Sequence, residues 1–263
     1  MHSLTPPGGP VTTGPQPGPA LLTASGTPGP LDTAHMPYIA LTAGEQRLHV
    51  PELVIGADGW VNYRYPTPYD WYPDSGVLLM RTVGAVPSGR PDGNLLSPFR
   101  QAHCMLNLLC QGCGAPAAIS PEGWRLWVLR ATSRTGGPAA TTGYTDMPPS
   151  CARCALHWCP VLSKAGRKLL WVAEADLVGI YGTLFPPVTG QVVQEKLVLL
   201  DNERELSAAV ATRFVRNLQR VREVDQAVIA ELARHQPVPA RPGASADLPA
   251  LITPGPQVLG RVR

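Results

Sequence analysis

The sequence has little net charge, no long hydrophobic run and no regular glycine period, and these absences narrow the class of protein. Charged residues make up 16% of the 263 residues, and the formal net charge is only +3. So mild a charge does not by itself indicate a nucleic-acid partner. No apolar stretch approaches the roughly 18 residues that a transmembrane helix needs, so we expect no membrane-spanning segment. Collagen is excluded because glycine does not recur at every third position.

Familiar catalytic motifs and a secretory signal are also missing. The sequence contains no P-loop, no G-x-S-x-G, no H-E-x-x-H and no dinucleotide-binding fingerprint. Near the N-terminus there is no basic segment, and the longest apolar stretch, Ala20–Leu22, is too short for a signal peptide. We therefore expect a cytoplasmic protein, in a reducing compartment where a disulfide framework is disfavoured.

Proline and glycine, in contrast, are abundant, and they gather at the two ends. Residues 1–35 hold eight Pro, six Gly and a single charged residue, and residues 236–263 hold six Pro. Such segments bury too little surface to offset their chain entropy, so both are predicted to be disordered tails. The remaining segment, 36–235, has a length that suits one large domain or two small ones, and we expect a single zinc-stabilised domain.

Apolar patterning over the middle predicts an α+β fold with antiparallel β segments. A hairpin is expected around Asp58-Gly59, and a helix is expected to start at Ser97-Pro98, an N-cap followed by proline. Apolar residues then recur every three or four positions over about 202–235, which predicts a long C-terminal amphipathic helix. The further expected strands are 77–83, 124–132, 168–174, 177–184 and 192–200.

Four of the six cysteines form two C-x-x-C pairs, Cys110/Cys113 and Cys151/Cys154. Each pair can supply two thiolates from one tight turn, and zinc takes four such ligands in a tetrahedron. The glycines in Cys110-Gln111-Gly112-Cys113-Gly114 permit the turn of a zinc knuckle. Ser150 is expected to cap a short helix whose first turn carries the second pair, because a helix N-terminus favours thiolate.

Knuckle, β-segment and helix follow in the order of a treble-clef motif, so we predict a structural Zn²⁺ site within a zinc module of about 97–162. Buried reduced cysteines and a redox C-x-x-C are the alternatives. Cys104 is expected in the core, whereas Cys159 and His157 rank behind the four cysteines as substitute ligands. Four thiolates leave no position for a catalytic water. A degenerate HNH-like nuclease is disfavoured because no His lies between Cys113 and Cys151.

Two further patterns concern partners. Arg213, Arg216 and Arg220 share one face of the expected long helix and are candidate contacts to DNA or RNA, although acidic residues balance arginine over this helix and a solvated face is commoner. The apolar stripe of the same helix also suits protein contacts or self-association. Six aromatic residues fall within 60–72, where they suit base stacking, a proline-rich peptide or, as we favour, attachment of an extended loop to the protein body.

The sequence around the cysteines resembles that of a known group of proteins. The run from Arg100-Gln101 through Cys104-Met105 and Leu108-Leu109 to Cys113-Gly114, followed by Pro148-Pro149, the second pair and Cys159-Pro160, resembles a group of uncharacterised actinobacterial zinc-binding proteins. Met36-Pro37-Tyr38 resembles their usual N-terminus. The resemblance implies a zinc-binding protein associated with phage or plasmid genes, and it implies no activity.

These patterns together predict a non-catalytic zinc protein that acts as a nucleic-acid-binding or regulatory module. A protein-interaction or structural module and a degenerate HNH-like nuclease are the alternatives.

Overall fold

A computed structural model describes most of the middle of the chain. The described residues are 37–42, 44–47, 52–67, 69–72, 75–83, 91–130, 143–145, 147–157, 166–185 and 192–236. All of them belong to one compact unit, 32–263. Apart from Gln236, the two tails that the sequence predicts to be disordered lie outside the described residues.

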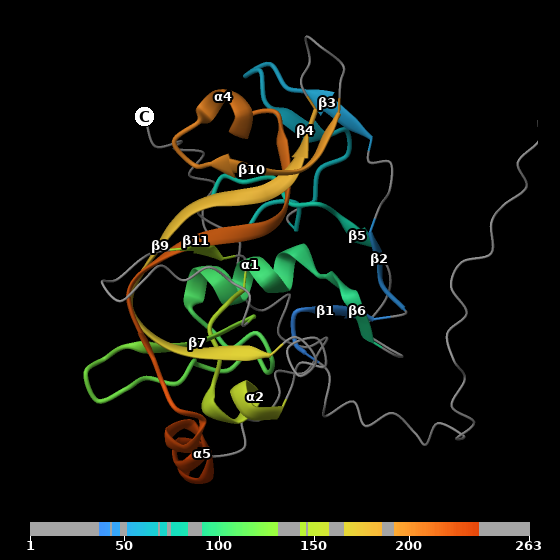
Figure 1. Ribbon diagram of the computed structural model, residues 1–263. Coiled ribbons are helices and arrows are strands. Elements are labelled where there is room, and N and C mark those ends of the chain that lie inside the picture. The colour runs from blue at the N-terminus through green and yellow to red at the C-terminus, as the bar shows by residue number, and fades with distance from the viewer. Residues whose placement is uncertain are drawn as a thin grey trace, which may run out of the picture. The chain divides into compact units, whose positions relative to one another are not determined.

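The described elements mix short helices with antiparallel strands, which confirms the predicted combination of α and β structure (Figure 1). In chain order they are β1 (Ala40–Thr42), β2 (Gln46–Arg47), β3 (Leu53–Ile55), β4 (Val61–Tyr63), β5 (Thr82–Val83), β6 (Pro91–Leu96), α1 (Pro98–Asn107), β7 (Arg125–Arg130), β8 (Gly143–Thr145), α2 (Ala152–His157), β9 (Arg167–Leu184), β10 (Val193–Leu199), α4 (Glu203–Leu206), β11 (Ala209–Glu223) and α5 (Gln226–His235).

Two long strands, β9 and β11, form the centre of the largest sheet, in which every pairing is antiparallel. β11 pairs with β9 from Leu170 to Leu184. The other edge of β9 is shared, because β7 pairs with its first six residues and β10 with its last six. β9 covers both of the strands predicted over 168–174 and 177–184, and it runs through the polar residue Asp176 that separates them in the sequence.

The predicted C-terminal helix of about 202–235 is wrong for most of its length. The structure has the short helix α4, then the 15-residue strand β11, and only then the ten-residue helix α5. The first half of β11 is buried on both faces, so its sequence shows no alternation of apolar and polar residues. Two register shifts against β9, after Ala211 and after Val215, disturb the period further. Apolar residues spaced by three or four therefore imitate a helix.

Helix α1 begins where the sequence predicts and packs along β11. The Ser97 hydroxyl accepts a hydrogen bond from the Arg100 amide at 3.3 Å, which makes Ser97 the N-cap. The buried Gln101 side chain then hydrogen-bonds to the backbone of β11 in the way that a neighbouring strand would. Its Nε2 donates to the Phe214 carbonyl at 3.0 Å, and its Oε1 accepts from the Phe214 amide at 2.8 Å. This side chain fixes α1 against β11.

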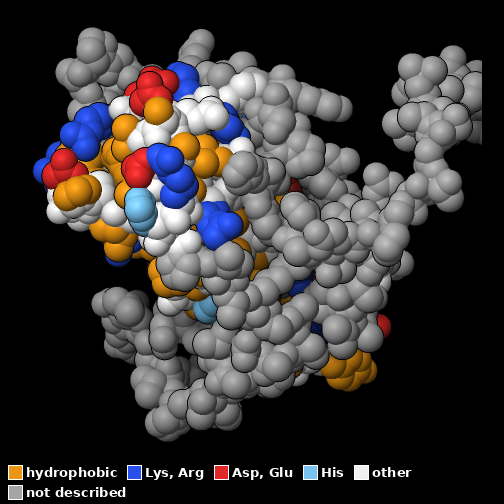
Figure 2. Space-filling view, turned by 90° about the horizontal axis from the view of Figure 1, so that it is seen from below, with side chains coloured by type: hydrophobic (Ala, Val, Ile, Leu, Met, Phe, Trp, Pro, Cys, Tyr) orange, Lys and Arg blue, Asp and Glu red, His pale blue; other side chains and the backbone are white. Residues whose placement is uncertain are grey.

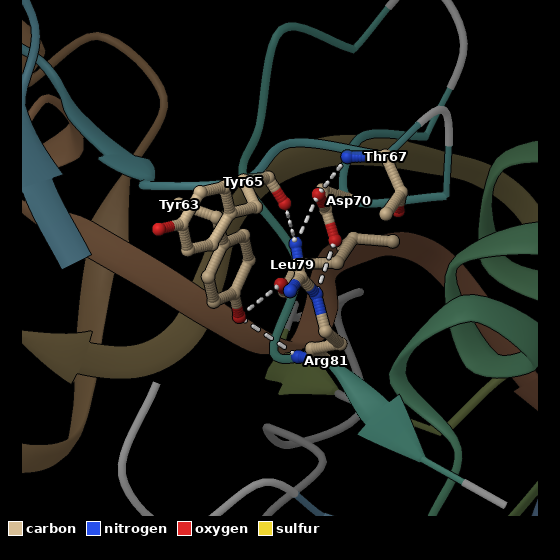
Figure 3. A network of polar contacts seen from close by, with 6 residues as sticks. All are labelled: Tyr63, Tyr65, Thr67, Asp70, Leu79 and Arg81. Carbon is tan, nitrogen blue, oxygen red and sulfur yellow. Dashed lines mark hydrogen bonds and ion pairs between the residues drawn. The ribbon is translucent and has the colours of Figure 1, made fainter. Parts of the chain in front are cut away.

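The aromatic segment 60–72 is held by a network around Arg81 (Figure 3). The Arg81 guanidinium donates to both carboxylate oxygens of Asp70, at 2.8 and 2.6 Å, and lies 4.0 Å from the centre of the Tyr63 ring. The Tyr63 hydroxyl donates to the Leu79 carbonyl and accepts from the Arg81 amide. The preferred interpretation, a loop attached to the protein body, agrees with these contacts. The predicted Asp-Gly hairpin is also confirmed, as β3 and β4.

Candidate metal centre

The structure brings the four predicted cysteines together in one buried cluster. Their Sγ atoms all lie within 4.8 Å of one another, and the sulfurs of Cys113 and Cys151 are 3.8 Å apart. A tetrahedron with metal–sulfur bonds of about 2.3 Å has sulfur–sulfur edges of about 3.8 Å. One metal ion can therefore contact Cys110, Cys113, Cys151 and Cys154 together. Among the described residues this is the one group of three or more possible metal ligands that converges.

The first pair lies in the knuckle that follows α1. The helix ends at Leu108, whose left-handed conformation turns the chain toward Cys110. Within the knuckle, the Gly112 amide donates to Cys110 Sγ at 3.3 Å, and Gly114 takes a positive φ of 73°. Both features match the predicted knuckle.

Gly112 has a second role, which is steric. A Cβ atom at this position would lie 2.7 Å from Cys154 Sγ and 2.8 Å from Cys154 Cβ. Only glycine lets the knuckle approach the second cysteine pair this closely.

The second pair lies at the start of α2, although its cap differs from the prediction. Cys151 precedes the helix, and its own sulfur accepts a hydrogen bond from the Cys154 amide at 3.4 Å. The expected cap, Ser150, instead donates to the Cys151 carbonyl at 3.1 Å and lies 3.8 Å from Cys110 Sγ. The cap is thus one residue later than predicted, because a Cys-x-x-Cys pair can place its first sulfur where a serine oxygen usually lies. The predicted helix stop, Pro160, lies outside the described residues.

Backbone hydrogen bonds tie the two pairs together around β7. The Gln111 amide donates to the Pro149 carbonyl at 3.0 Å, which joins the knuckle to the segment before α2. The Ser150 amide donates to Leu126 in β7, and the Ser150 carbonyl accepts from Ala118. Knuckle, strand and helix therefore follow in the predicted order and form one connected unit.

The four thiols of the cluster differ in pKa. Hydrogen bonds from the other three cysteines lower the pKa of Cys110 well below that of an ordinary thiol. Hydrogen bonding to Cys110 raises the pKa of Cys113 and of Cys154, and burial raises both further. For Cys151 the hydrogen bond with Cys110 raises the pKa, but those with Cys113 and Cys154 outweigh it, so its pKa is also lowered. The cluster by itself thus favours the thiolate form of one cysteine in each pair. A cation at the centre would favour the thiolate form of all four.

The remaining cysteines and the nearby histidine are placed as follows. Cys104 is fully buried in α1, and its sulfur donates to the Cys110 carbonyl at 3.6 Å. Burial raises the pKa of this thiol, so Cys104 is a core residue, as predicted. His157 is the last residue of α2. Its side chain and the whole of Cys159 lie outside the described residues.

The three arginines predicted to contact nucleic acid lie in β11 and not on a helix. Arg216 is buried, and its guanidinium donates to the carbonyls of Met105 and Ala175. Arg213 pairs with Glu195, and Arg220 pairs with Glu174 at 2.6 Å. The single basic helix face on which the prediction relied does not exist, because β11 alternates its side chains between two faces of the sheet.

Sequence reasoning missed two contributors to the centre. Ser150 was expected to act on the helix backbone, yet its hydroxyl lies beside Cys110. Gln111 supports the second pair through its backbone amide, a role that its side-chain type does not signal. Both residues adjoin a cysteine pair, and that proximity is the signal by which they could have been found.

No known protein family matches this chain, and neither a curated protein nor a solved structure is similar to it. Among the described residues, no helix combines the length and apolar character needed to cross a membrane.

Proposed function

We propose that this chain is a zinc-stabilised binding or regulatory protein, in which Zn²⁺ is structural and plays no part in catalysis. The observation that carries the proposal is the convergence of four buried sulfurs within 4.8 Å. Four protein thiolates complete the tetrahedral shell of zinc and leave no position for a water or a substrate. The order of knuckle, strand and helix supports a treble-clef-like motif.

Zinc fits this ligand set better than the other common biological metals. A tetrahedral set of four sulfurs is typical of zinc or iron, whereas oxygen ligands suit magnesium, calcium and manganese. Zinc has no redox chemistry and accepts the geometry that a small protein imposes. We therefore assign zinc, and metal analysis will separate it from iron.

The proposed ion acts as a cross-link within a small core. The two cysteine pairs are separated by 37 residues of sequence, and the proposed ion joins them through four bonds to one atom. The four cysteines form a separate buried group with Ala115 packed against them. Metal bonds supply the stabilisation that so few apolar contacts cannot provide.

A protein partner is favoured over DNA or RNA. The described arginines of β11 are occupied by acids or carbonyl groups, and Figure 2 shows basic side chains interspersed with acidic and apolar ones on the face in view. Tyr65 and Tyr69 are exposed by 71% and 48%, on the loop that the Arg81 network holds. Exposed tyrosines on a fixed backbone suit a protein interface.

Metal analysis of the purified protein tests the structural site. We expect one zinc ion per chain, lost in the Cys113→Ser and Cys151→Ser variants and retained in Cys104→Ser. The Cys104 variant is the matched control, because this buried cysteine lies beside the cluster without belonging to it. Unchanged zinc content in the first two variants would show that the cluster does not bind the metal.

A second assay separates the partner classes. We expect random-sequence DNA to bind weakly, with no change when Arg213 and Arg220 are both replaced by alanine. Salt-dependent binding that falls markedly in this double variant would instead support the nucleic-acid role.

A further inference from the structure

The last described helix, α5, lies against the helix that carries the second cysteine pair. In Figure 1 α5 and α2 lie at the same end of the fold, and α2 is the element that α5 contacts most extensively. The fully buried Ile229 of α5 packs in one apolar cluster with Ala152 and Ala155 of α2. Helix α2 therefore forms part of the surface against which α5 packs, and any interaction that orders α2 also orders that surface.

Gln236 connects the end of α5 to the start of α2. Its side-chain Oε1 accepts a hydrogen bond from the Ala152 amide at 3.2 Å, and its backbone carbonyl accepts from Arg153 at 3.4 Å. The first amides of a helix have no partner within the helix, so Gln236 satisfies one that Cys151 leaves open. Ala152 and Arg153 lie between the two cysteines of the second pair.

The other end of the described fold is attached to the first cysteine pair. The Tyr38 amide donates to the Gly112 carbonyl at 2.9 Å, and the Ile39 amide donates to the Gln111 carbonyl at 3.3 Å. Both carbonyls belong to the two residues between Cys110 and Cys113. Each C-x-x-C turn thus holds one end of the described fold.

We propose that the metal ion controls the attachment of both ends, so that its loss releases residues 38–39 and the helix α5 together. This inference rests on the proposed metal site. With the ion bound, the knuckle and α2 are held in one geometry, and they present fixed partners to the two ends. Without it, the four buried thiols repack, and the hydrogen bonds to Tyr38, Ile39 and Gln236 lose their fixed partners.

The release is local because other contacts hold the centre of the fold. β9 and β11 pair over most of their length without any contribution from the cysteines. β1 is held by β6, with Ala40 opposite Leu96. The Ser97 amide donates to the Ile39 carbonyl at 2.8 Å, so the N-terminal release stops at Ile39. Helix α5 keeps the residues of β7 and β9 in its apolar cluster, but it loses the ordered surface of α2 and the hydrogen bonds at Gln236.

The proline-rich segments 1–35 and 237–263 continue the chain beyond these two attachment points. Residues 38–39 follow the first of these segments closely, and α5 precedes the second, so metal occupancy would act on the chain directly beside both. A metal-sensitive attachment of residues 38–39 and α5 is the regulatory device that we infer.

Amide hydrogen exchange, measured by mass spectrometry on the full chain with zinc and after chelation, tests this inference. We expect exchange to rise at least tenfold on chelation in peptides that cover 38–39 and 226–236. Peptides from β9 and β11 should change less than threefold. With zinc bound, Gln236→Ala should raise exchange at the end of α5 and the start of α2 only, whereas the control Glu231→Ala, at an exposed residue whose partners Arg234 and His235 lie in α5 itself, should leave α2 unchanged.

Three outcomes overturn the inference. Chelation that leaves both ends protected, or that releases one end without the other, would show that the metal does not control their attachment. Exchange that rises equally in β9 and β11 would show that the ion supports the whole fold. If the purified protein holds no zinc in the parallel metal analysis, the proposed function itself fails, and that failure is visible before any exchange is measured.

Discussion

Replacement of Gly112 by alanine tests the geometry of the metal centre with a single methyl group. The added Cβ would lie 2.7 Å from Cys154 Sγ, whereas ordinary contacts begin at 3.4 Å. The sulfur or the knuckle must therefore move by about 0.7 Å. The length of a metal–ligand bond varies by only about 0.2 Å. The variant therefore cannot keep Cys154 Sγ bonded to the metal and also hold the new Cβ at an ordinary contact distance from that sulfur.

We expect the added methyl group mainly to weaken metal binding. In the metal-free protein the Cys154 side chain can shift away from the new methyl group, whereas the ion fixes its position in the bound form. Overpacking of a close-packed site costs about 1–3 kcal/mol. If this cost appears only with metal bound, zinc affinity falls by about 5- to 150-fold, because 1.4 kcal/mol corresponds to a factor of ten.

Competition with a chromophoric zinc chelator measures this change. The control is Gly59→Ala in the hairpin turn, where a Cβ would meet nothing within 4 Å although φ is +80°. That variant should lose a little stability through its backbone conformation and keep its zinc affinity. Equal zinc affinity of the Gly112 variant and the unmodified protein would refute the geometry described here.

Three other predictions concern the scaffold. Gln101→Leu should lower the free energy of unfolding by about 1–3 kcal/mol for each of the two Phe214 backbone groups that lose their partner, as measured by urea denaturation. Arg216→Met should destabilise the fold because it frees buried carbonyls of α1, and a variant as stable as the parent would contradict that role. Burial raises the pKa of Tyr63 to about 12, above the usual pKa of about 10, so unfolding releases a proton between these values. Stability should therefore be unaffected by this group below pH 10 and fall between pH 10 and 12, and Tyr63→Phe should remove that part of the fall.

The candidate cysteine cluster could be predicted from the sequence because the signal of each pair is local. Two cysteines at a fixed spacing, with glycines beside them, constrain a turn whatever the rest of the fold does. The hairpin at Asp58-Gly59 and the cap at Ser97 have the same property, and the structure contains both. Each of these features depends on fewer than six consecutive residues.

The path of the C-terminal segment could not be predicted, because it depends on distant partners. β11 is a strand since β9 pairs along it, and the two-sided burial of its first half removes the alternation that would identify it. The same misassignment placed Arg213, Arg216 and Arg220 on one face. The attachment of Gln236 to α2 joins residues 84 positions apart, and no local pattern indicates such a contact.

X-ray absorption at the zinc edge of the purified protein tests the central claim most directly. Four sulfur neighbours at about 2.3 Å, with no nitrogen or oxygen neighbour, are the predicted first shell of Cys110, Cys113, Cys151 and Cys154. A shell that contains water or imidazole, or protein that carries no metal at all, would contradict the closed structural site on which this account depends.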